Sequence, residues 1–152
     1  MLRSYNPTQH RLIIFSREDT VPSIRYSDEL GLLTSQAPSL GEITYFAFGI
    51  PSPEFHDELW GEIHCLINPA TERALNNTLH SNHGLDCDKK WKRDGKNGLT
   101  SEPATLPYYI RNSIHHPENR HNKPYTDDEL AESTKSLIAV LKTLQSTQVS
   151  NQ

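Results

Sequence analysis

The feature that most limits how this chain can fold is a series of helix-start signals beginning at residue 39. Ser39 is followed three residues later by Glu42, the spacing of a capping box, in which each residue bonds a backbone N–H of the other. Ser52 and Asn68 are each followed by a proline, and a cap residue followed by proline is typical of a first helical turn. Each signal leads into a segment with apolar residues. The pattern therefore predicts three consecutive helices, over about 40–48, 53–67 and 69–79.

Two further helices are expected in the second half of the chain. One covers 106–116 and ends at Pro117, because the residue before a proline is pushed out of the α region. The other begins at a second capping box, formed by Thr126 and Glu129, and carries an apolar stripe to about residue 145. Leu137 and Leu141 lie on this stripe, where substitutions would test assembly.

The remaining segments lack helical patterning. A short apolar run within residues 10–16 favours a strand, and residues 17–38 are interpreted as a loop with a turn of helix. Residues 80–104 are interpreted as a long surface loop, with a short element hidden within it as the alternative. We expect residues 1–38 to form an N-terminal extension of strand or loop, residues 39–146 one helical domain, and residues 147–152 a disordered tail. The predicted fold class is mainly α, with a short N-terminal strand.

The composition is lean for a single domain of 152 residues, with 34% hydrophobic residues and a mean hydropathy of −0.68. Either the core is small and padded with loops, or a partner covers part of the surface. The net charge of −4 argues against a general nucleic-acid coat protein, yet it leaves room for a local basic patch.

The expected compartment is the cytoplasm, and no membrane partner is expected. No stretch approaches the roughly 18 apolar residues of a membrane span, and the N-terminus lacks the order of a signal peptide. The two cysteines, Cys65 and Cys87, are too few for a disulfide-stapled scaffold.

The richest concentration of catalytic residue types lies in the predicted helix before Pro117. Arg111 is always cationic and can form two hydrogen bonds to one phosphate. Asn112 and His116 are four residues apart and share a helix face, where the amide can fix the imidazole tautomer. A neutral imidazole can take the proton of a ribose 2′-hydroxyl while an arginine stabilises charge on the phosphate. Arg and His thus suffice to cut RNA without a metal.

A structural interpretation of the same residues stays open. Arg111 would then form an ion pair with Glu118 or Asp127. His115 and His116 would be ordinary residues at a helix C-terminus, where positive charge is favourable.

The string Arg111-Asn112-Ser113-Ile114-His115-His116 resembles the Arg-Asn-x-x-x-His signature of the HEPN superfamily. The run over 109–119 and the capped helix after it further resemble ATPase-linked HEPN modules of bacterial defence systems, and residues 53–60 do so more weakly. The resemblance implies a small bundle of about four or five helices that forms a homodimer, with two copies of the motif lining one cleft.

The resemblance also implies residue roles and an activity. Arg111 would bind phosphate and stabilise charge, His116 would act as general base or acid, Asn112 would orient it, and His115 ranks below His116 because of its spacing. The implied function is a metal-independent endoribonuclease acting as a toxin or antiviral defence effector, without cofactor or metal. The alternative is a non-catalytic HEPN-like module that docks on an ATPase or on a toxin or antitoxin partner.

A basic segment precedes the motif helix and is a candidate RNA-contact region. It comprises Lys89, Lys90, Trp91, Lys92, Arg93 and Lys96. Lysine and arginine attract phosphates, and an exposed Trp offers a base a stacking face. The alternative is a solvated charge run with Trp91 folded back onto the core.

Metal and nucleotide sites have weaker support. His80, His83 and Cys87 are spaced so that they could ligate zinc, with His64 or Cys65 as a fourth ligand. The alternative is surface histidines and a buried cysteine. Because no Gly-rich phosphate loop is present, any ATP involved would be bound by another polypeptide.

Overall fold

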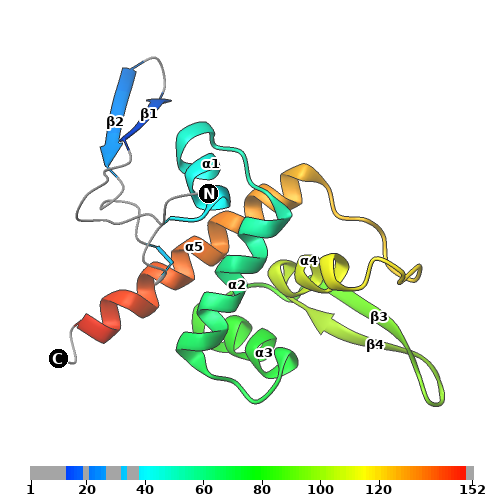
Figure 1. Cartoon of the computed structure of the whole chain (residues 1–152). Helices are drawn as coiled ribbons and strands as arrows, with labels where there is room; N and C mark the ends of the chain where they lie inside the picture. The colour runs from blue at the N-terminus through cyan, green and yellow to red at the C-terminus, as the bar shows by residue number, and fades with distance from the viewer. Residues whose placement is uncertain (1–12, 19–20, 27–31, 34–37, 150–152) are drawn as a thin grey trace, which may run out of the picture.

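The computed structural model describes residues 13–18, 21–26, 32–33 and 38–149 (Figure 1). Two strands come first, β1 (Ile13–Glu18) and β2 (Val21–Tyr26). They are followed by α1 (Leu40–Phe48), α2 (Pro53–Ile67), α3 (Glu72–His83), β3 (Lys89–Gly95), β4 (Gly98–Ala104), α4 (Leu106–His115) and α5 (Asp127–Val149). Within these residues the fold is mainly α, as the sequence predicts, with two separate antiparallel hairpins. No helix of the described part is both long and apolar enough to cross a membrane.

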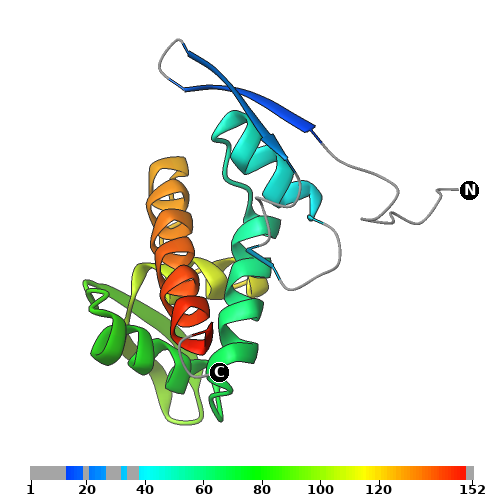
Figure 2. The same cartoon turned by 90° about the vertical axis from the view of Figure 1, so that its left-hand side faces the viewer.

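The core forms where α2 packs against α5 (Figure 2). Phe55, Leu59 and Ile63 recur every four residues along α2 and have no exposed surface. Leu137 and Leu141 do the same on α5. A spacing of four residues returns a helix to nearly the same side, so these residues form one buried stripe on each helix. Since Leu137 and Leu141 are buried within a single chain, the expectation that they test assembly is wrong.

The helices begin at the side-chain caps that the sequence marks. Thr126 and Glu129 form both halves of a capping box before α5. Ser39 accepts a hydrogen bond from the Glu42 backbone N–H, the first half of the box before α1. The Glu42 carboxylate, however, accepts a buried 3.1 Å hydrogen bond from the backbone N–H of Leu32. This contact ties the segment before α1 to the helical domain.

The start of α3 differs from the expectation. Asn68 does not cap the third helix but ends α2, in the left-handed conformation with φ 49°. Asparagine is one of the few residues that adopts this conformation at a helix C-terminus, so the Asn-Pro pair is ambiguous. Thr71 caps α3, which extends to His83 rather than to Leu79.

The interpretation of residues 80–104 as a long loop is wrong, because β3 and β4 pair there as a hairpin. Asn97-Gly98 is a hairpin-turn signal, and Gly98 has the positive φ (106°) that such a turn needs. The strands lack the apolar alternation that marks a half-buried sheet, since only Trp91, Glu102 and Ala104 of β3 and β4 are buried.

The chain ends also differ in part from the expectations. The strand expected within residues 10–16 is confirmed over 13–16, whereas residues 10–12 lie outside the described residues. Interpreting 17–38 as loop is wrong for β2, which pairs with β1 from Val21 to Tyr26. α5 extends to Val149, so the tail predicted over 147–152 is helical as far as 149, and 150–152 lie outside the described residues.

Burial of His56 predicts a pH-dependent stability. This α2 residue has no exposed surface, its Nε2 lies 2.8 Å from Ser133 Oγ on α5, and burial lowers its pKa from 6.5 to about 4. The unfolded chain therefore binds one more proton than the folded chain between these values, so stability falls as the pH decreases through this range. We expect a loss of about 2 kcal/mol from His56 between pH 7 and about pH 4.5, measured by urea unfolding.

Two variants separate the contribution of His56 to the pH dependence of stability from that of the carboxylates. The His56→Gln variant keeps a polar side chain but cannot titrate, so its unfolding free energy should change less over this pH range. A His83→Gln variant should keep the pH dependence of the unsubstituted protein. An unchanged pH dependence in His56→Gln would contradict the assignment.

Candidate functional site

The position of α4 is set by contacts between its N-cap residue and α3. Thr105 caps α4, and its backbone N–H and hydroxyl both donate to the Asn76 side-chain oxygen, at 2.9 and 3.0 Å. The Asn76 amide also donates to the Pro103 carbonyl at the end of β4. One buried side chain thus joins α3, the hairpin and the start of α4. The helix ends at His116, which is its C-cap, immediately before Pro117.

Arg111 faces α3 and is engaged in an ion pair. Its Nη2 donates to Glu72 Oε1 at 3.2 Å, and its Nη1 donates to the Asn112 side-chain oxygen at 3.3 Å. The side chain is only 18% exposed. Glu72 also accepts a 2.7 Å hydrogen bond from the Trp60 indole on α2. The partner of Arg111 is therefore Glu72, rather than the Glu118 or Asp127 considered from the sequence.

The two adjacent histidines have different surroundings. His115 Nε2 lies 2.6 Å from Asp57 Oδ1, so this residue links α4 to α2. His116 Nδ1 lies 3.3 Å from Glu118 Oε1, in the loop that follows α4. The carboxylate of Glu118, rather than the amide of Asn112, therefore contacts the His116 ring. His116 is about half exposed, with 51% of its side chain accessible.

Asn112 is buried beneath this surface and contacts Arg111 and Tyr108. The hydroxyl of Tyr108 donates to Glu102 Oε1 on β4 at 2.8 Å. Burial is the main cause that raises the pKa of Tyr108, and its hydrogen bond with Asn112 acts in the opposite direction. The sequence predicts that Asn112 orients the His116 ring; in this structure Asn112 instead contacts the Arg111 and Tyr108 side chains.

The hairpin supplies cations but no free stacking surface. Trp91 is 3% exposed and packs against the rings of Tyr109 and His116, at centroid distances of 5.7 and 6.3 Å. The expectation that Trp91 stacks on a base is therefore wrong, and its alternative, a Trp folded onto the core, is confirmed. Lys89 forms an ion pair with Glu129 and lies over the Tyr109 ring. The remaining basic candidates are exposed: Lys90, Lys92, Arg93 and Lys96.

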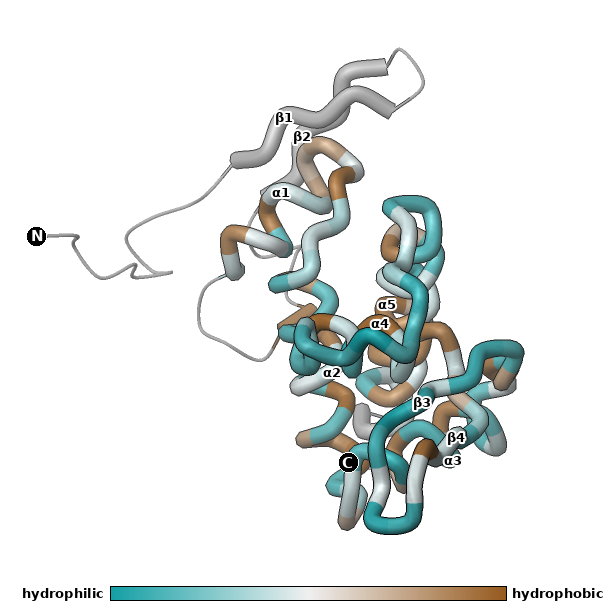
Figure 3. The backbone as a smooth tube through the Cα atoms, turned by 90° about the vertical axis from the view of Figure 1, so that its right-hand side faces the viewer, coloured by the Kyte–Doolittle hydropathy of each residue, from teal (hydrophilic) through white to brown (hydrophobic). Residues whose placement is uncertain are grey.

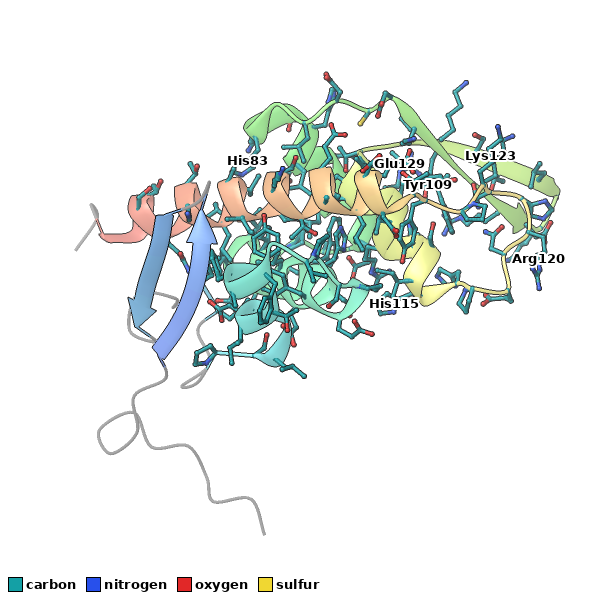
Figure 4. The ribbon with its side chains drawn as sticks, turned by 90° about the horizontal axis from the view of Figure 1, so that it is seen from above. His83, Tyr109, His115, Arg120, Lys123 and Glu129 are labelled. Carbon is teal, nitrogen blue, oxygen red and sulfur yellow. The ribbon has the colours of Figure 1, made fainter. Side chains whose placement is uncertain are left out.

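The loop over 117–125 folds back along β3. The side-chain amide of Asn122 both donates to the Lys92 carbonyl (2.8 Å) and accepts from the Lys92 backbone N–H (2.9 Å). Asn119 donates to the same carbonyl, and His121 Nε2 lies 3.1 Å from Asp94 Oδ1. Figure 4 shows Arg120 and Lys123 on this loop, beside the hairpin. The loop thus covers the outer edge of β3 with side-chain amides.

These three segments enclose a cavity of about 430 Å³. Its lining comprises Trp91, Arg93 and Asp94 of β3, Tyr108, Asn112 and His116 of α4, and residues 118–121 of the loop. The structure therefore brings together four residues that the sequence predicts as site residues: Trp91, Arg93, Asn112 and His116. Arg120 and His121 also line this cavity, although sequence reasoning missed them, whereas Arg111 and His115 are not among its lining residues.

Charge is concentrated around this cavity. Residues 89–125 contain eight of the chain's 15 Lys and Arg residues but only three of its 19 Asp and Glu residues. This segment is therefore positive, while the whole chain has a net charge of −4. The hydropathy colouring of the backbone shows β3 and the loop after α4 as mostly hydrophilic segments (Figure 3). The result is a local basic region on an acidic protein, suited to a polyanion.

The zinc interpretation receives no structural support. His80 Nδ1 lies 2.7 Å from the Leu85 carbonyl, just after α3. Within the described part of the chain, no three side chains of His, Cys, Asp or Glu are arranged to hold a metal ion. Both cysteines are free thiols, with Cys65 exposed and Cys87 partly buried.

Comparisons with protein-family models, with curated proteins and with solved structures gave no match to this chain. The site is therefore interpreted from its own geometry.

The Arg111 ion pair predicts a stabilising role for this residue. Arg111→Ala leaves the partly buried Glu72 carboxylate without its cation, so we expect a loss of about 1–3 kcal/mol in the free energy of unfolding. Chemical denaturation measures this loss. Arg73→Ala is a matched control, because Arg73 is 65% exposed and its ion pair with Glu102 is longer, at 3.6 Å. It should cost no more than about 1 kcal/mol. Equal costs for both variants would contradict the assignment.

Proposed function

We propose that this protein is an endoribonuclease that cuts RNA without a metal, with the cavity between β3, α4 and the 117–125 loop as its active site. The observation that carries the proposal is the cavity itself, in which His116 lies with two arginines from different segments inside the basic region. The reaction is attack of a ribose 2′-oxygen on the adjacent phosphorus, which forms a 2′,3′-cyclic phosphate and releases a 5′-hydroxyl.

His116 is the general base in this proposal. When Nδ1 carries the proton towards Glu118, the lone pair of the imidazole is on Nε2. Among the described residues, Nε2 of His116 has no protein hydrogen-bond partner, so it is available to the 2′-hydroxyl of a bound RNA. The half-exposed position at the helix end lets substrate reach the ring. Catalysis by a positioned base contributes about 10²–10⁴-fold.

Arg93 and Arg120 stabilise the phosphate in this cavity. Arg93 is 59% exposed and lies 3.9 Å from Glu102, a distance that leaves its guanidinium able to bind a second anion. Arg120 comes from the loop, so two separate segments each contribute a guanidinium group to the cavity lining. Arginine matches a phosphate geometrically and stabilises charge that develops on its oxygens. Lys90, Lys92 and Lys96 extend the positive surface along the hairpin for the rest of the strand.

Arg111 acts in this proposal through the fold rather than on the phosphate. The HEPN resemblance gives it the phosphate-binding role, and that role would require its ion pair with Glu72 to open. The homodimer implied by the resemblance remains part of the proposal, with a complete site in each copy, and an ATPase or antitoxin is a further proposed partner.

Exposed apolar side chains at the two ends of α1 and just after it favour the second candidate, a non-catalytic module that docks on a partner protein. Leu40, Phe48 and Ile50 are 79%, 71% and 56% exposed. Covering these side chains with a partner protein would remove their apolar area from water, which favours association. A protein that binds RNA or a partner protein but leaves RNA intact would support this candidate.

The proposal predicts cleavage of single-stranded RNA in the presence of EDTA, with products that end in a 2′,3′-cyclic phosphate. His116→Gln should reduce the single-turnover cleavage rate by about 10²–10⁴-fold, because the amide cannot take the 2′-hydroxyl proton. The measurement is single-turnover cleavage of a labelled oligonucleotide, with product ends identified by mass spectrometry.

His115→Gln is the matched control, since His115 precedes His116 on the same helix but pairs with Asp57 outside the cavity. Its cleavage rate should equal that of the unsubstituted protein. Loss of activity in His115→Gln with full activity in His116→Gln would reverse the assignment. An inert unsubstituted protein would refute the nuclease proposal.

A further inference from the structure

We propose that His121 is the second proton-transfer residue of this site, donating the proton that the departing 5′-oxygen requires. The inference rests on the proposed ribonuclease function and adds a catalytic residue to it. Its basis is the placement of a second imidazole in the cavity, on a separate segment from His116. Attack and departure occur on opposite sides of the phosphorus in an in-line displacement, so a base and an acid must come from different positions.

His121 is held in place on two sides. Its backbone N–H donates to the Asn119 side-chain oxygen at 3.0 Å, and its Nε2 lies 3.1 Å from Asp94 Oδ1 on β3. Asn119 in turn donates to the Lys92 carbonyl, so the loop is fixed to the strand on both sides of His121. Because Nε2 of His121 faces the Asp94 carboxylate, Nδ1 is the ring nitrogen left to donate to substrate.

The other polar groups of the cavity are poorly suited to this role. The Tyr108 hydroxyl already donates to Glu102 at 2.8 Å. Guanidinium groups keep their protons in proteins, so Arg93 and Arg120 cannot act as acids near neutral pH. Glu118 and Asp94 contact the two imidazoles and orient them. Among the residues that line the cavity, His116 and His121 carry the imidazole side chains, the type that most often transfers protons in catalysis.

The step balances with these two groups alone. His116 removes the 2′-hydroxyl proton while the bond between O2′ and phosphorus forms. The bond between phosphorus and O5′ breaks, and the proton of His121 passes to O5′. The products are a 2′,3′-cyclic phosphate and a 5′-hydroxyl, and afterwards His116 is protonated and His121 neutral. Exchange with water restores both residues.

A sulfur-containing substrate tests this assignment. In an RNA whose scissile O5′ is replaced by sulfur, the leaving thiolate needs no proton. We expect His121→Gln to cut ordinary RNA about 10²–10⁴-fold more slowly than the unsubstituted protein, but to recover most of this loss on the sulfur substrate. His116→Gln should stay slow on both substrates, because the 2′-hydroxyl still requires a base.

The outcomes separate the inference from the proposed function. If the unsubstituted protein cuts ordinary RNA and His121→Gln is equally fast, or equally slow on both substrates, the role of His121 is refuted while the nuclease proposal stands. If the unsubstituted protein cuts neither substrate, both fail. The melting temperature of each variant is measured alongside, and His121→Asn, a second non-titrating substitution, replaces His121→Gln if that variant is unfolded.

Discussion

The arrangement of the site depends on the hydrogen bonds and the ion pair that the Glu72 carboxylate forms. It accepts from the Trp60 indole of α2 and from the Arg111 guanidinium of α4, while lying itself in the first turn of α3. A carboxylate is favoured there by the helix dipole. Three helices are thereby joined through one side chain. Because Arg111 is held towards α3, the rotation of α4 about its axis is fixed, and Asn112 and His116 face the hairpin.

The second constraint is the pairing of the 117–125 loop with β3. An uncovered strand edge presents unpaired backbone groups, which proteins commonly cover with a loop or a helix. Here the amides of Asn119 and Asn122 bond the backbone of Lys92 in place of another strand. The loop cannot continue as a helix because Pro117 ends α4. The same two features therefore form part of the cavity wall and place His121 among its lining residues, together with His116.

The helical part of this fold could be predicted because its signals are local. Caps such as Thr126 and stripes such as Phe55, Leu59 and Ile63 depend on spacing within one helix. The hairpin was missed because most of its residues are exposed, so its strands carry no apolar alternation. His116 could be predicted from the motif helix. His121 could not, because its place in the cavity depends on hydrogen bonds between segments 27 residues apart in the chain.

The five-residue spacing of the motif explains why the side chains of Arg111 and His116 do not lie together. Each residue of an α-helix rotates by about 100°, so side chains five positions apart point about 140° away from each other. Arg111 and His116 therefore lie on different sides of α4, one against Glu72 and the other at the cavity. For Arg111 to contact a phosphate bound at His116 of a second copy, its partly buried ion pair with Glu72 would have to open. Arg93 and Arg120 supply positive charge beside His116 without that cost, so one chain contains every group that the proposed chemistry needs.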